Sequence, residues 1–115
     1  MLTAKIRVQS TEGDWVVRAD GAVIGESKHA LELLEENMAP VIYFPREDLA
    51  MAFLEPSETT LRSTQKGTAR FFNIILRSRV IADAAWTIEE PAPEATRIAG
   101  YIAFHPGLVT LEELN

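Results

Sequence analysis

The N-terminal quarter of the chain alternates apolar and polar residues in short runs that break at paired Asp and Gly residues. Period-two alternation is typical of β-strands with one buried face. An Asp-Gly pair between two such runs favours a tight type I′ hairpin turn, because both central residues of that turn take a positive φ. The pattern predicts strands over residues 4–9, 14–19 and 22–27, with Asp20 and Gly21 in a hairpin turn. The first quarter of the chain is therefore predicted to form β structure.

The rest of the chain continues mostly as short apolar segments bounded by proline and glycine. Residues 29–36 fit either a strand or two helical turns, and the strand is favoured because Pro40 disfavours helix in the residue before it. Further strands are predicted at residues 41–44, 67–76, 80–88, 101–104 and 108–111. The strands at residues 67–76 and 80–88 are separated by a turn near Ser78 and are expected to pair as a central antiparallel hairpin.

The clearest helical pattern begins at Pro45 and stops at Pro56. Proline is favoured in the first turn of a helix, where the acidic Glu47 and Asp48 would complement the helix dipole. Apolar residues then recur at helical spacing. After the second proline, a polar linker is expected over residues 57–60.

These elements predict a fold class between mainly β and α+β. We expect a compact antiparallel sheet or partly open barrel of about eight strands with one clear helix. One or two more helical turns are expected at residues 94–98, which have proline before them and glycine after them. The 115 residues are expected to form a single domain, residues 1–115, since one core organises roughly 100–150 residues.

The composition restricts the chemistry that is available. Hydrophobic residues make up 47% and charged residues 24% of the chain, as in soluble globular proteins. The absence of cysteine excludes disulfides, thiolate metal ligands and a cysteine nucleophile. The residues after Met1 lack the apolar stretch of a signal peptide, and no apolar run is long enough to cross a bilayer. A cytoplasmic location is therefore expected.

The positive charges are unevenly distributed along an acidic chain. The net charge is −6, from 11 basic and 17 acidic residues. Such a charge repels phosphate backbones and anionic lipid surfaces, so we expect neither nucleic-acid nor membrane binding. One segment, residues 59–82, contains no carboxylate and contributes five cations, Arg62, Lys66, Arg70, Arg77 and Arg79.

Within that segment an extended strand would place Lys66, Thr68 and Arg70 on one face. The two cations would then stand about 13–14 Å apart. Such a strip can bind a phosphate or carboxylate, and Gly67 would let the ligand approach the backbone. The alternative is that these cations neutralise neighbouring acids and discourage pairing of an exposed sheet edge.

No motif identifies a reaction. Glycine-rich phosphate loops and a serine nucleophile elbow are absent. Glu12 and Asp14, the one acidic pair at a spacing of two residues, are interpreted as a hairpin tip rather than a magnesium site. His29 and His105 have no partners at metal-binding spacing, so no metal or other cofactor is expected. His105 precedes Pro-Gly, which favours a turn histidine, with a general base as the alternative.

Two acidic residues interrupt apolar segments. Glu26 ends one strand and Asp83 lies inside another, and a buried carboxylate must be paired, be hydrogen-bonded or have a raised pKa. A structural ion pair with the basic segment and a carboxylate in a pocket are both open interpretations. Trp86, nearby, fits a core residue better than a stacking platform.

Five segments of the chain resemble a bacterial family catalogued as domain of unknown function 427. In order and spacing they cover roughly Val16 to Leu111, and they lie at residues 23–27, 43–49, 66–69, 83–86 and 98–104. The resemblance implies a compact, β-rich domain. It implies no established activity, although a nucleotidyltransferase label is attached to the family.

The motif-matched polar and aromatic residues are Glu26, Tyr43, Lys66, Asp83 and Trp86. The chain also departs from the family pattern. It has Ser63-Thr64-Gln65 where Cys-Pro-aromatic is common, and it has Ile88 and His105 where tyrosine is common. A family mechanism that required the thiol would be lost or weakened here.

These observations lead to three functional hypotheses. The first is a binding domain for a small anionic or nucleotide-like ligand, in a pocket between the Lys66 strand and the Asp83 strand. Its candidate ligand-binding residues are Lys66, Arg70, Glu26, Asp83, Trp86 and Tyr43. The second is a protein-interaction or homo-oligomer module using the aromatic pair Phe71-Phe72. The third is a nucleotidyl-transfer enzyme that depends on the two carboxylates.

Overall fold

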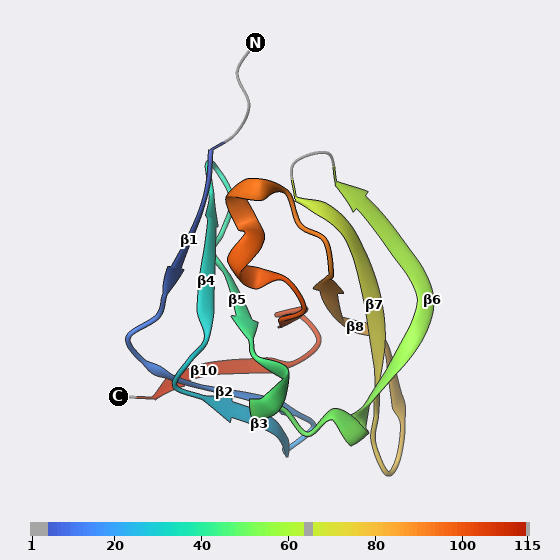
Figure 1. Ribbon diagram of the computed structural model, residues 1–115. Helices are drawn as coiled ribbons and strands as arrows, with labels where there is room; N and C mark the ends of the chain where they lie inside the picture. Colours follow the sequence, from blue (N-terminus) through green and yellow to red (C-terminus); the bar gives the residue numbers. More distant parts are fainter. Residues whose placement is uncertain (1–4, 64–65, 115) are drawn as a thin grey trace.

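Two open antiparallel sheets make up the fold (Figure 1). The computed structural model describes residues 5–63 and 66–114. Its strands are β1 (Ile6–Ser10), β2 (Asp14–Ala19), β3 (Ala22–Ser27), β4 (Leu31–Glu35), β5 (Val41–Phe44), β6 (Leu54–Ser63), β7 (Gly67–Ile75), β8 (Val80–Ile88), β9 (Ile102–Phe104) and β10 (Thr110–Leu114). Three short 3-10 segments accompany them, η1 (Arg46–Asp48), η2 (Met51–Phe53) and η3 (Pro93–Ile98).

The larger sheet has seven strands in the order β1-β4-β5-β9-β8-β7-β6, and the smaller has the order β10-β2-β3. The larger sheet curls, with η3 lying inside the curve, while the three strands of the smaller sheet cross below it (Figure 1). One core, which includes Val17, Ile24 and Phe104, joins the two sheets. A second core, which includes Ile98 and Ala103, packs η3 against the other face of the larger sheet.

The expected β-rich architecture is confirmed, and most strands lie where alternation predicted them. The predicted strands 14–19, 22–27, 41–44 and 80–88 match the observed bounds. Asp20 and Gly21 have φ values of 50° and 85°, as an Asp-Gly hairpin turn requires. The first predicted strand included Ala4, which lies outside the described residues. No helix among the described residues is long and apolar enough to span a bilayer.

The helix predicted after Pro45 is wrong. That segment forms two separate 3-10 turns, η1 and η2, and between them Leu49 makes an isolated antiparallel bridge with Gly25 of β3. The amide of Ala50 also donates to the carbonyl of Ile24 at 2.7 Å. Pairing with β3 therefore takes the backbone groups that a continuous helix would have used.

The linker predicted at residues 57–60 is also wrong, because these residues belong to β6. This strand lies at the edge of the larger sheet, where proline is tolerated, and its pairing register shifts between Pro56 and Thr60. The proline and the many polar residues of this edge strand give it a composition that is typical of a loop. The larger sheet therefore gains a strand that alternation did not reveal.

The close approach of Leu49 to β3 gives a test of this architecture. A Cβ atom at position 25 would lie 2.5 Å from Leu49 Cδ2 and 2.6 Å from the carbonyl oxygen of Asp48. Gly25→Ala is therefore expected to lower the free energy of unfolding by about 1–3 kcal/mol in urea denaturation. Val23→Ala, at an exposed position on the same strand, is the control and should cost less than about 1 kcal/mol. Equal losses would contradict the contact.

Candidate functional site

A cavity of about 400 Å³ opens on the face of the larger sheet that carries η3. Strands β5, β6, β7 and β8 and the segments after β6 and β9 contribute to its wall. Its lining residues are Tyr43, Leu61, Ser63, Lys66, Gly67, Ala69, Phe71, Trp86, Ile88 and His105. Three of the six ligand-binding residues predicted from the sequence, Tyr43, Lys66 and Trp86, are thus brought together here.

A cross-strand row of side chains forms the middle of this cavity. Tyr43 lies opposite Ala103, Ala103 opposite Trp86, and Trp86 opposite Phe71, so all four project from one face. Above the small Ala103, the Trp86 indole N–H donates to the Tyr43 hydroxyl at 3.2 Å. The Trp86 and Phe71 rings pack at a tilt of 43° with centroids 6.0 Å apart. The row therefore forms an aromatic wall with a hydroxyl at its buried end.

The Tyr43 hydroxyl remains protonated in this setting. Only 1% of Tyr43 is exposed, and burial raises the pKa of its hydroxyl. The negative charge of Glu35 raises the pKa further, whereas the hydrogen bond from Trp86 opposes the shift. Because the oxygen accepts from Trp86 and keeps its proton, the hydroxyl can also act as a donor.

Lys66 is held in place by its backbone and by its side chain. Its amide donates to Ser63 Oγ at 3.1 Å, and its carbonyl accepts from the amide of Ala92 at 2.9 Å. Its ammonium group forms an ion pair with Glu35 Oε1 at 3.1 Å, where the two side chains are only 24% and 13% exposed. Lys66 is therefore a positioned cation at the edge of an apolar cavity.

His105 follows β9 and lies two residues after Ala103 of the aromatic row. Its amide donates to the carbonyl of Ala84 at 2.8 Å, and its Nδ1 accepts from the amide of Gly107 at 3.0 Å. The second bond confirms the interpretation of His105 as a turn histidine. Its side chain also lines the cavity, which the turn chemistry alone did not indicate.

Arg70 does not share a face with Lys66, so the predicted strip is wrong. On β7, Arg70 lies between the cavity residues Ala69 and Phe71 and therefore projects from the opposite face. There it lines a separate depression with Arg62. Lys66 precedes the strand, and the positive φ of 116° at Gly67 interrupts the alternation. Thr64 and Gln65, at the departure from the family pattern, lie outside the described residues.

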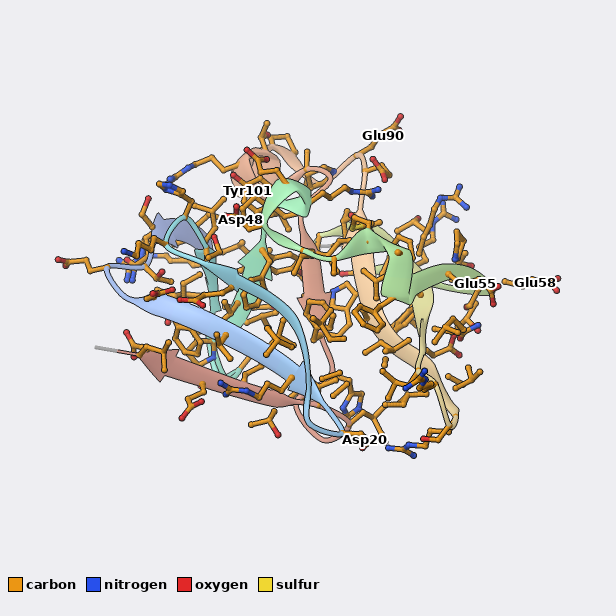
Figure 2. All side chains as sticks on the ribbon, turned by 90° about the horizontal axis from the view of Figure 1, so that it is seen from below. Asp20, Asp48, Glu55, Glu58, Glu90 and Tyr101 are labelled. Atoms are coloured by element: carbon orange, nitrogen blue, oxygen red, sulfur yellow. The ribbon has the colours of Figure 1, made fainter. Side chains whose placement is uncertain are left out.

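The other cations of the basic segment do not belong to the cavity lining. Arg79 binds Asp20 through two hydrogen bonds of 2.5 and 3.0 Å, which join the β7–β8 hairpin to the β2–β3 turn. Figure 2 shows Asp20 at the tip of that turn. The hydrogen bond from Arg79 lowers the pKa of Asp20. The segment thus supplies one cation to the cavity rather than a common positive patch.

Glu26 lies outside the cavity, on an exposed position of β3. A hydrogen bond shared with the Asp14 carboxyl raises the pKa of Glu26, and repulsion between the two charges adds to the shift. Asp14 Oδ1 is buried and has no hydrogen-bond donor in the described structure. The two carboxyls form a local pair on the smaller sheet.

Asp83 also lies outside the cavity lining and acts as a structural acceptor. Its carboxylate accepts from Ser57 Oγ at 2.6 Å and from Thr59 Oγ1 at 2.8 Å, and its amide donates to Asn73 Oδ1 at 2.9 Å. Its φ is 51°. Asp83 therefore fixes the irregular part of β6 against β8 through hydroxyl groups, where the sequence had suggested an ion pair or a pocket carboxylate.

Several site residues were not predicted. Leu61 was missed because β6 was read as a linker followed by an unassigned segment. Glu35 was missed because an acidic residue at a strand end gives no local sign of its partner. Phe71 was noticed, but as part of an exposed aromatic pair, whereas Phe72 lies in the main core on the other face.

The family model described as a domain of unknown function, DUF427, matches residues 7–115. The chain belongs to the DUF427 family. The resemblance read from the five segments is confirmed, and the match reaches from β1 to β10. None of the curated proteins matches the chain. Within residues 5–63 and 66–114 of this DUF427 chain, no three acidic or histidine side chains form a group suited to a metal ion.

The Glu26–Asp14 pair predicts a pH-dependent stability difference. With a raised folded-state pKa, Glu26 takes up its proton in the folded protein before it does so in the unfolded chain, so this pair favours folding as the pH falls. Above that pKa the two charges repel each other. Glu26→Gln is therefore expected to raise the urea midpoint at neutral pH, and the advantage should shrink towards pH 4.5, the ordinary glutamate pKa.

Glu58→Gln is the control for this comparison, since Glu58 projects from β6 into solvent (Figure 2). This variant should follow the wild-type pH profile. A constant advantage of Glu26→Gln at every pH would show that the carboxyl pair has no linked proton.

The hydrogen bonds of Asp83 give a prediction about the stability of the contact between β6 and β8. Asp83→Ala removes two accepted hydrogen bonds and places alanine at a positive φ, so the free energy of unfolding should fall by about 2–4 kcal/mol. Asp83→Asn should lose less, because asparagine tolerates a positive φ and keeps one acceptor oxygen. Urea denaturation measures both. A loss below about 1 kcal/mol for the alanine variant would contradict the structural role.

Proposed function

We propose that this DUF427 domain binds a small molecule that has a planar apolar body and an anionic group, in the cavity on β5, β7 and β8. The observation that carries the proposal is the position of Lys66, held by Glu35 at a largely apolar cavity that Tyr43 and Trp86 also line. A volume of about 400 Å³ lies within the range of roughly 300–1,000 Å³ that is usual for small-molecule sites.

The polar groups of the lining support an acceptor-rich ligand. Lys66 offers an ammonium and Tyr43 a protonated hydroxyl, and no carboxylate belongs to the described lining. Such donors suit carboxylate, phosphate or carbonyl oxygens. The rings of Trp86 and Phe71 offer apolar contact to a planar body, so aromatic acids and nucleotide-like molecules are the favoured classes.

Glu35 does not prevent anion binding by Lys66. An ammonium has three donors, and the ion pair uses one of them at 3.1 Å. Glu35 also orients the lysine side chain. A ligand anion would thus join an existing ion pair, and its affinity would rest on the apolar body as well as on the charge.

The proposal is tested with 2-naphthoate, a planar aromatic carboxylate, titrated against the protein while tryptophan fluorescence and NMR shifts are recorded. Lys66→Ala is expected to weaken binding about tenfold, the loss of roughly 1.4 kcal/mol. Arg70→Ala removes a cation from the opposite face of the same strand and should leave the affinity unchanged. Equal effects of the two variants, or no binding by the wild type, would overturn the proposal.

A second matched pair tests the place of binding. Leu61 and Leu108 are both exposed, at 63% and 42%, but only Leu61 lines the cavity. Leu61→Glu places a carboxylate at the cavity and should abolish 2-naphthoate binding, whereas Leu108→Glu should not. Melting temperatures of all four variants confirm that each remains folded.

The other two hypotheses have less support. Phe71 faces the cavity and Phe72 the core, so the aromatic pair offers no common contact surface for a homo-oligomer. The exposed edge of β6 is the surface that such a module would use, and sedimentation velocity at micromolar concentration tests it. Nucleotidyl transfer draws no support from Glu26 or Asp83, which lie outside the cavity. A cytoplasmic location without nucleic-acid or membrane binding stays a prediction.

A further inference from the structure

We propose that His105 determines ligand specificity in this cavity, as a hydrogen-bond donor through Nε2 that reads a carbonyl or similar uncharged acceptor apart from the anionic group of the ligand. This inference rests on the proposed function and makes the ligand class narrower. The favoured ligand is an elongated aromatic acid with a second, uncharged acceptor at the end distant from its carboxylate.

The turn after β9 fixes which nitrogen of His105 carries the proton. A backbone N–H can only donate, and the amide of Gly107 points at Nδ1 from 3.0 Å. Nδ1 must therefore present its lone pair. In the neutral ring the proton is then on Nε2, the nitrogen on the far side of the ring from the turn.

The same bond orients the ring. The amide of His105 is bound to Ala84 and its Nδ1 to Gly107, so both the backbone and the ring are fixed before a ligand arrives. Little side-chain freedom remains to be lost on binding, which favours a specific contact. The ring lines the cavity, and a neutral N–H suits carbonyl, hydroxyl or ether oxygens.

The backbones of His105 and Lys66 are anchored at different points along β8. His105 is bound to Ala84, whereas Lys66 is bound to Ala92, beyond the end of that strand at Ile88. The four steps from Ala84 to Ile88 alone span roughly 13 Å of strand. The proposal therefore assigns the two side chains to separate acceptors of an extended ligand.

Two probes that differ at one end test this inference. 2-Naphthoate carries only the carboxylate, whereas 6-acetyl-2-naphthoate adds a carbonyl at the opposite end. The wild type is expected to bind the acetyl compound about fivefold more tightly, the usual effect of one hydrogen bond. His105→Phe should bring this ratio to about one, and His105→Gln, which keeps a donor, should retain part of it.

The tautomer is tested without a ligand, by the ¹⁵N shifts of the ring in the wild-type protein. The chain has two histidines, so His29→Gln assigns the signals. A protonated Nε2 and a bare Nδ1 are expected for His105, and the opposite tautomer would overturn the inference.

The outcomes separate the two proposals. If 2-naphthoate binds and Lys66→Ala weakens it, but the acetyl compound binds no better, the role of His105 is wrong and the proposed function stands. If His105→Phe keeps the wild-type ratio, the second acceptor is read elsewhere and the inference is again wrong. If neither probe binds the wild type, both proposals fail.

Discussion

The whole arrangement depends on the alternation of residue size in β9, the strand that joins the two halves of the larger sheet. Its three residues are buried, with Ile102 and Phe104 on one face and Ala103 on the other. Phe104 packs edge-on against Phe44, with ring centroids 5.8 Å apart, in the core shared with the smaller sheet. Ala103 leaves room on the opposite face for the bond between Tyr43 and Trp86. A large residue there would compete with both rings for the same space.

The edge of the cavity depends on a second local constraint, at the start of β7. Gly67 has a φ of 116°, and a Cβ atom there would lie 2.9 Å from the carbonyl oxygen of Glu90. The glycine therefore permits both the backbone conformation and the close contact with the segment after β8. The same turn also places Lys66 where its ammonium group pairs with Glu35 on β4, which is separated from β7 by three strands of the larger sheet. The conformation of Gly67 therefore affects both the packing of the segment between β8 and η3 and the position of Lys66.

Sequence reasoning succeeded where the decisive interactions are local. Alternation and the Asp20-Gly21 turn placed β2 and β3, because side-chain period and turn conformation are properties of neighbouring residues. It failed after Pro45, where helical spacing was present but the bridge from Leu49 to Gly25 decided the conformation. That bridge joins residues distant in sequence, and no local pattern reveals it.

The candidate site was predictable to the same extent. The family segments pointed to Tyr43, Lys66 and Trp86, and the structure brings these three together. Arg70 was misplaced because one positive φ between it and Lys66 changes the face on which each projects. The partners of Asp83 are hydroxyls on a strand that was itself missed.

The charge distribution acquires a different meaning once the fold is known. A carboxylate-free segment suggested a positive surface, yet its cations project from different faces, and two of them are paired with acids elsewhere in the fold, on β4 and in the β2–β3 turn. In the proposed function, selectivity for an anion therefore comes from one ion pair beside an apolar wall. In such a setting a single positioned charge interacts more strongly than several solvated ones, because little water screens it. A net charge of −6 then governs long-range repulsion, while in the proposed function Lys66 with its Glu35 partner governs what the cavity accepts.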